Sequence, residues 1–167
     1  MITTSALPTP PAPDPALDLV IERVLRAPRA AVWRCWAEPE LFVQWWCPKP
    51  WVTELRALEL RPGGAFHTTM RGPDGGVSDN PGCVLEVVPG ERLVTTSLLT
   101  GGWRPAVPWM GMTALWTLAD APGGGTHYRA VAMHPDADAC RRHAEMGFHE
   151  GWGVCAEQLD ALACSLD

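Results

Sequence analysis

Three side chains combine acid–base chemistry with a place on a predicted strand that turns them inward. On the predicted strand from Tyr128 to His134, alternate side chains point inward, and His134 is the last of them. An imidazole with its ordinary pKa of about 6.5 suits a general base near neutral pH. Glu86 alternates with Val84 and Val88, which predicts an inward carboxylate that needs an arginine, tyrosine or tryptophan partner if it is buried. The catalytic candidates are His134, Tyr128 and Glu86, although a histidine that only completes the core fits the same pattern.

Cys140, His143 and His149 are the only residues grouped as metal ligands might be, and their spacing is unsuitable. On one regular helix His143 and His149 point about 120° apart, so they would not share one ion. No glycine-rich phosphate loop runs from a strand into a helix, and no G-x-S-x-G turn is present. The sequence therefore predicts no metal and no cofactor.

The six cysteines are scattered without a C-x-x-C pair, which is typical of buried thiols in a reducing compartment. No positively charged segment followed by an apolar one indicates export, so we expect a cytoplasmic protein. A net charge of −6 argues against a nucleic-acid partner or an anionic membrane surface. No apolar run approaches the roughly 18 residues of a transmembrane helix.

Aromatic residues point to an apolar pocket, because the chain has nine tryptophans against three phenylalanines and one tyrosine. Trp45 and Trp46 lie at a predicted helix end and Trp109 in a long loop, where indoles can form the mouth of a ligand site or simply anchor the loop. Period-two alternation places further large side chains on inward strand faces. The candidate ligand-binding residues are Trp45, Trp46, Phe66, Met70, Trp109, Met112, Trp116, Tyr128, His134, Gly147, Phe148, Gly151 and Trp152.

Glycines are unusually dense in the predicted last helix, at 147, 151 and 153. A helical glycine costs about 1 kcal/mol relative to alanine, so three within seven residues need a reason. One explanation is close packing of the helix on a sheet, and the other is a slot where a ligand touches bare backbone. Asn80, in a predicted turn over 79–82, is an outside candidate for a polar contact at the pocket rim.

The elements that would position these residues follow from periodicity and turn residues. Residues 1–16 contain five prolines and predict a flexible tail, and 17–167 form one domain. Short helices are predicted from Pro28 and from Glu38-Pro39, and one long helix over 136–163. Strands are predicted near 17–27, 51–61, 64–71, 82–88, 92–99, 110–119 and 126–134. Their short connections imply an antiparallel sheet, and the whole is α+β.

Several local patterns, in this order, make the sequence resemble the START-like superfamily, also called SRPBCC or helix-grip. They are APRAAVW at 27–33, WWCP at 45–48, LRPGGAF at 60–66, MRGPDG at 70–75, LEVVPGERL at 85–93 and EMGFHEGW at 145–152. The chain looks most similar to the bacterial branch related to the activator of the heat-shock chaperone ATPase. The resemblance implies a curved antiparallel sheet of about seven strands wrapped around a long C-terminal helix, with two short helices after the first strand.

The resemblance also implies a pocket for apolar ligands between sheet and helix, so the first hypothesis is binding of a small, mostly apolar molecule. An alternative is a cyclase- or hydrolase-like enzyme acting on a polyketide-like or other apolar substrate, which requires two of the three acid–base candidates to converge. A second alternative is a chaperone-associated interaction module, which requires an exposed patch in place of a cavity. The protein is expected as a monomer or a homodimer.

Overall fold

The main sheet of the protein has five antiparallel strands in the order β1-β10-β9-β6-β5. The computed structural model describes residues 9–166. The strands are β1 (Asp18–Leu25), β5 (Cys83–Val88), β6 (Arg92–Thr96), β9 (Thr113–Asp120) and β10 (Thr126–Met133). The register aligns Ile21, Ala130, Trp116 and Leu93 in one row across four strands, and all four belong to the core. Strand alternation thus turns one face of the sheet inward.

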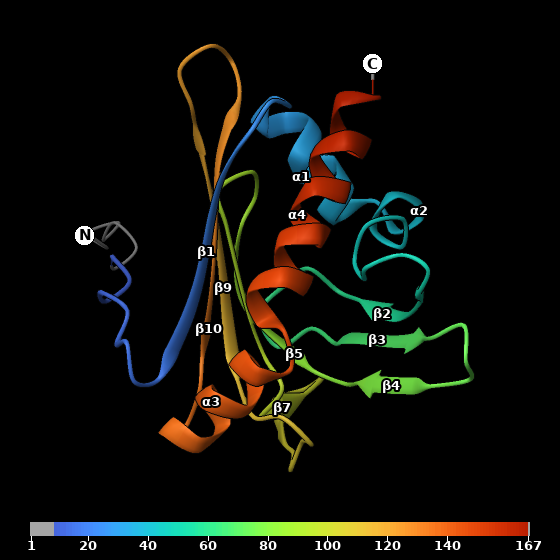
Figure 1. Cartoon of the computed structure of the whole chain (residues 1–167), viewed down its shortest axis with the longest axis vertical. Coiled ribbons are helices and arrows are strands. Elements are labelled where there is room, and N and C mark those ends of the chain that lie inside the picture. Colours follow the sequence, from blue (N-terminus) through green and yellow to red (C-terminus); the bar gives the residue numbers. More distant parts are fainter. Residues whose placement is uncertain (1–8, 167) are drawn as a thin grey trace, which may run out of the picture.

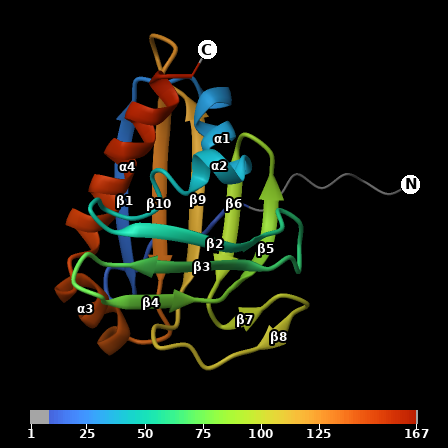
Figure 2. The ribbon, with the colours of Figure 1, turned by 90° about the vertical axis from the view of Figure 1, so that its right-hand side faces the viewer.

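A second sheet, of β2 (Val52–Leu58), β3 (Phe66–Arg71) and β4 (Val77–Asn80), crosses the main sheet at a steep angle (Figure 2). A short ribbon of β7 (Leu99–Thr100) and β8 (Arg104–Pro105) lies at the lower end of the molecule (Figure 1). All seven predicted strands are present, and β4, β7 and β8 are additional. Residues 79–82 were predicted as a turn, but Asp79 and Asn80 belong to β4, which pairs with β3.

Within residues 9–166 four helices complete the fold: α1 (Arg29–Ala37), α2 (Pro39–Phe42), α3 (Ala137–Glu145) and α4 (Phe148–Cys164). The two short helices after β1 are as predicted, and α4 runs along the inner side of the main sheet (Figure 1). The predicted single helix over 136–163 is instead broken between α3 and α4. Gly147 causes the break, because its φ of 92° is left-handed, a conformation that glycine adopts at little cost.

The core centres on aromatic rings at the meeting point of α1, α2 and the sheet. The Trp36 ring lies 4.7 Å from Trp45, 4.9 Å from Trp116, 5.4 Å from Trp46 and 5.9 Å from Phe42, measured between centroids. At these distances aromatic rings attract one another, and this attraction adds to the stabilisation that comes from burying their apolar surface. The cluster therefore holds the two short helices against β9.

The N-terminal segment enters the fold through a turn at its end. The Asp14 carbonyl accepts hydrogen bonds from the N–H groups of Leu17 and Asp18, and the Asp18 carboxylate accepts one from the Asp14 N–H. The predicted flexible tail covers 1–16, and its first eight residues lie outside the described part. Within residues 9–166 no helix is long and apolar enough to cross a membrane.

Candidate functional site

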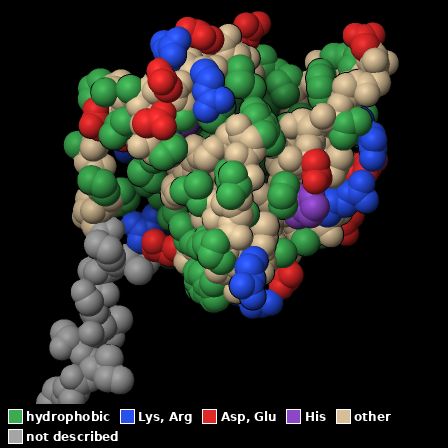
Figure 3. Space-filling model, turned by 90° about the horizontal axis from the view of Figure 1, so that it is seen from below, with side chains coloured by type: hydrophobic (Ala, Val, Ile, Leu, Met, Phe, Trp, Pro, Cys, Tyr) green, Lys and Arg blue, Asp and Glu red, His purple; other side chains and the backbone are tan. Residues whose placement is uncertain are grey.

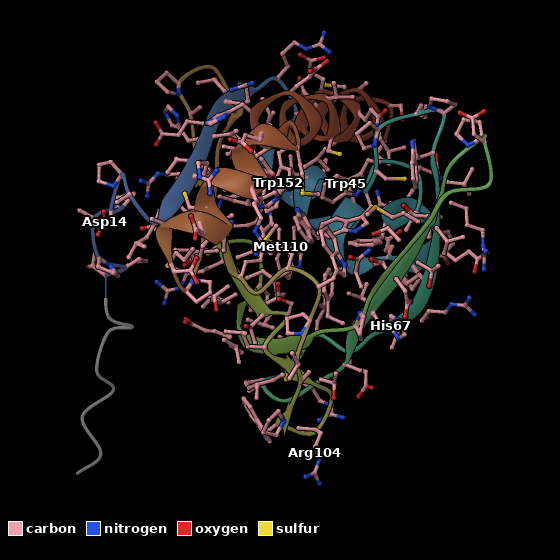
Figure 4. The ribbon with its side chains drawn as sticks, turned by 60° about the horizontal axis from the view of Figure 1, so that its bottom comes forward. Asp14, Trp45, His67, Arg104, Met110 and Trp152 are labelled. Carbon is pink, nitrogen blue, oxygen red and sulfur yellow. The ribbon has the colours of Figure 1, made fainter. Side chains whose placement is uncertain are left out.

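A cavity of about 700 Å³ lies between the two sheets and α4. Its walls come from β3, β4, β6, β9 and β10, from α3 and α4, from the segment after α2 and from the loop before β9. Figure 4 shows Trp45, Met110 and Trp152 toward the middle of the molecule, whereas Asp14, His67 and Arg104 lie at its periphery. This volume is within the range of small-molecule sites, which run from about 300 to 1,000 Å³.

Twelve of the thirteen predicted ligand-binding residues line this cavity. They are Trp45, Trp46, Phe66, Met70, Trp109, Met112, Trp116, Tyr128, Gly147, Phe148, Gly151 and Trp152. The exception is His134, which does not line the cavity and instead hydrogen-bonds a residue that does, His143. Segments more than 100 residues apart in the chain therefore converge on one space.

The glycines of the last helical segment divide into two kinds. A Cβ built at Gly147 or Gly151 would meet no atom within 4 Å, whereas one at Gly153 would lie 2.9 Å from Arg23 Nη2. Gly153 thus gives room to a neighbouring side chain. Gly147 and Gly151 both line the cavity and have open space where a Cβ would stand, so close packing of helix on sheet does not explain them.

The cavity wall reaches the surface at the turn joining α3 to α4 and at the loop before β9, toward the lower end of the molecule (Figure 1). Three apolar lining residues are exposed there: Val107, Trp109 at 54% and Met146 at 60%. Hydrophobic side chains reach the surface in the middle of this face and charged ones gather toward its rim (Figure 3). The Trp109 indole N–H donates to Asn80 Oδ1 at 3.1 Å, which places Asn80 at the rim as a polar contact.

Burial keeps three titratable side chains of the cavity wall neutral, those of Tyr128, Cys155 and Cys47. Burial raises the pKa of Tyr128, and the hydrogen bond between Trp116 and the phenol only partly opposes this. Burial also raises the pKa of Cys155 to about 12 and that of Cys47 above its ordinary value. Because a thiolate is the reactive form of cysteine, neither thiol is prepared as a nucleophile.

Among the described residues, His143 supplies the one imidazole on the cavity wall. Its Nδ1 lies 2.8 Å from His134 Nε2, and His134 Nδ1 lies 2.8 Å from the Leu17 carbonyl oxygen. Burial, together with the neighbouring His134, lowers the pKa of His143 to about 4. The imidazole of His143 is therefore neutral at physiological pH.

Glu86 is not an inward carboxylate, contrary to the prediction from alternation. The pairing of β5 with β6 shifts register between Val84 and Glu86, a β-bulge that reverses the phase of the following residues. Glu86 consequently does not line the cavity, and its Oε1 accepts a hydrogen bond from Arg92 Nε at 2.9 Å. Of the three acid–base candidates only Tyr128 lines the cavity.

Several polar lining residues were not predicted from the sequence, among them His143, Thr68 and Thr95. Thr68 stands midway between Phe66 and Met70 in β3, so the same alternation that found its neighbours could have found it. His143 was considered only as a metal ligand. No local pattern marks it, since its place depends on the break at Gly147.

The depressed pKa of His143 predicts a loss of stability in mild acid. The unfolded chain takes up a proton at His143 near pH 6.5 and the folded chain only near pH 4, so the free energy of unfolding falls as pH drops through this window. The contribution amounts to at most about 3 kcal/mol. Urea titrations between pH 4 and 7 measure it.

Two variants isolate this contribution from that of the carboxylates. His143→Phe is expected to flatten the pH dependence of unfolding, whereas His127→Phe, at an exposed position of β10, is expected to retain it. Equal slopes in both variants would contradict the assignment to His143.

Comparisons with known proteins agree with this architecture. A family model described as activator of Hsp90 ATPase homolog 1-like protein matches residues 26–163. A crystal structure from Nitrosomonas europaea is 47% identical, with TM-score 0.84 over 89% of this chain and 95% of that one. A crystal structure from Mycobacterium smegmatis is 25% identical, with TM-score 0.76 over 91% and 93%.

A more distant solution structure, described as an AHSA1-like protein from Aeromonas hydrophila, shares the fold. It is 21% identical, with TM-score 0.65 over 87% of this chain and 91% of that one. A search of curated proteins found no significant match.

Proposed function

The chain belongs to the family of activator of Hsp90 ATPase homolog 1-like proteins, and from this premise we propose that it binds one small, mostly apolar, uncharged molecule in the cavity beside α4. The observation that carries the proposal is the open space facing Gly147 and Gly151. Protein interiors are normally packed as densely as organic crystals, so a large space walled by aromatic rings calls for an occupant.

The chemistry of the wall indicates the class of molecule. None of the described lining residues is lysine or arginine, and the one carboxylate among them, Asp79, is engaged by His67 and Thr69. An anionic ligand would therefore lose its hydration without gaining a counter-charge. Stacked and tilted indoles such as Trp46, Trp116 and Trp152 instead suit a flat or aliphatic body.

The enzyme alternative receives less support. It requires two acid–base groups within hydrogen-bond reach of one point in the cavity. Glu86 is paired with Arg92 away from the cavity, and both ring nitrogens of His134 are engaged, one by Leu17 and one by His143. Tyr128 alone does not form an acid–base pair. The interaction-module alternative needs no cavity, and so it leaves the space beside α4 without explanation.

The proposal is tested by looking for the molecule itself. The protein is purified and examined by native mass spectrometry, then denatured, and its extract is analysed for organic compounds. We expect a bound neutral molecule with an apolar body, whose removal changes the tryptophan emission because six indoles border the space. A protein that is empty as purified is then titrated with 2-methoxynaphthalene by calorimetry. Absence of both a retained molecule and probe binding would overturn the proposal.

A further inference from the structure

His134 and His143 form a hydrogen-bond chain that begins at the Leu17 carbonyl oxygen. This oxygen determines which atom donates and which accepts in each following hydrogen bond. A carbonyl oxygen only accepts, so His134 Nδ1, at 2.8 Å from the Leu17 oxygen, carries a proton. In a neutral imidazole the other nitrogen is then bare, and His134 Nε2 accepts from His143 Nδ1 at 2.8 Å. His143 in turn is left with a bare Nε2.

This Nε2 atom has no hydrogen-bond partner within the described residues, yet it is not sealed inside the protein. Apart from Arg129 Nε, every fully buried side-chain nitrogen or oxygen in the described part of the chain has a hydrogen-bond partner. His143 Nε2 therefore keeps accessible surface, and His143 lines the cavity. The rings of Phe148 and Trp152 stand edge-on to the imidazole at 5.2 and 5.9 Å, and within the described residues neither ring forms a hydrogen bond to it.

We infer that His143 Nε2 is the acceptor to which the cavity binds a ligand hydroxyl group, so that the ligand is a neutral apolar alcohol or phenol. The inference rests on the proposed function and names the ligand class for the same cavity. An acceptor in an apolar wall favours a molecule that brings a donor, because a molecule without one leaves the nitrogen dehydrated and unpaired.

His134 has a positioning role in this arrangement. It does not line the cavity, but by accepting from His143 Nδ1 it holds the proton on the side away from the ligand. The neutral state of His143, which follows from its lowered pKa, keeps the second nitrogen free over the physiological range. Replacing His134 by leucine would leave the His143 proton free to occupy either nitrogen.

The test compares two probes of nearly equal shape, 2-naphthol and 2-methoxynaphthalene, of which only the first donates a hydrogen bond. Kd values are measured by calorimetry for the unmodified chain, His143→Phe and the matched control His127→Phe. The ratio of the Kd of 2-methoxynaphthalene to that of 2-naphthol is expected to be about tenfold higher in the unmodified chain and His127→Phe than in His143→Phe. This ratio cancels general effects on the cavity.

The tautomer is read directly from the ring ¹⁵N chemical shifts of the ligand-free protein at pH 7. We expect a protonated Nδ1 and a bare Nε2 at His143, and a mixture of the two tautomers in His134→Leu. A protonated Nε2 would overturn the inference, because the wall would then present a donor.

The remaining outcomes separate this inference from the proposed function. If both probes bind and His143→Phe leaves their ratio unchanged, the hydroxyl acceptor is refuted and the apolar cavity stands. If neither probe binds the unmodified chain, the proposed function fails and this inference fails with it.

Discussion

Replacing Gly151 by phenylalanine is expected to weaken binding of apolar molecules by roughly 10- to 100-fold while the protein remains folded. A Cβ at this position meets nothing within 4 Å, so the new ring extends into the cavity and occupies the place of the ligand. Helix α4 should tolerate the change, because phenylalanine has a better helix propensity than glycine. Calorimetry with 2-methoxynaphthalene measures the loss, and the thermal midpoint reports the fold.

Gly151→Ala is the matched control at the same position. It adds only the Cβ, so binding should change little, while the free energy of unfolding should rise by about 1 kcal/mol from helix propensity. Destabilisation by alanine would show that the helix needs glycine here for packing. Unchanged binding in Gly151→Phe would place the ligand elsewhere.

Replacing Trp36 by alanine is expected to reduce the free energy of unfolding by about 3–5 kcal/mol. This ring is 1% exposed and meets four other aromatic rings, so its removal leaves a void at the junction of α1, α2 and β9. A loss of this size is a large part of the 5–15 kcal/mol, approximately, that stabilises an ordinary domain. Urea unfolding followed by circular dichroism measures it.

Trp109→Ala provides the contrast for this prediction. Trp109 is more than half exposed at the cavity mouth and its indole donates one hydrogen bond, to Asn80, so the loss of stability should stay within about 1 kcal/mol. Equal losses for Trp36 and Trp109 would mean that the aromatic cluster is not the centre of the core.

Much of the fold could be predicted from short-range patterns. Alternation found seven strands, and Pro28 and Pro39 marked the starts of the two short helices, because each of these signals depends on neighbouring residues alone. The same alternation placed Phe66, Met70 and Trp116 on the wall of one cavity. These residues share one face because successive side chains of a strand point to opposite faces of the sheet. This prediction does not depend on which elements pack against that face.

The features that were not predicted depend on backbone conformation and tertiary contacts, which short-range sequence patterns do not encode. The left-handed Gly147 separates α3 from α4, and a glycine in a sequence does not reveal the sign of its φ. One extra residue in β5 turned the Glu86 side chain to the opposite face of the sheet. His143 reaches the cavity only because both the helix break and the pairing with His134 place it there, and these are tertiary effects.

The distribution of the cavity wall along the sequence has a thermodynamic consequence. Its residues run from Trp45 to Cys155, so the complete wall exists only when the whole fold has formed, and an unfolded chain offers a ligand no comparable site. Any true ligand must therefore shift the folding equilibrium, by about 2.7 kcal/mol at a free concentration of 100 times its Kd. Heat resistance in the presence of mixed neutral compounds thus becomes a direct assay for ligands of this cavity.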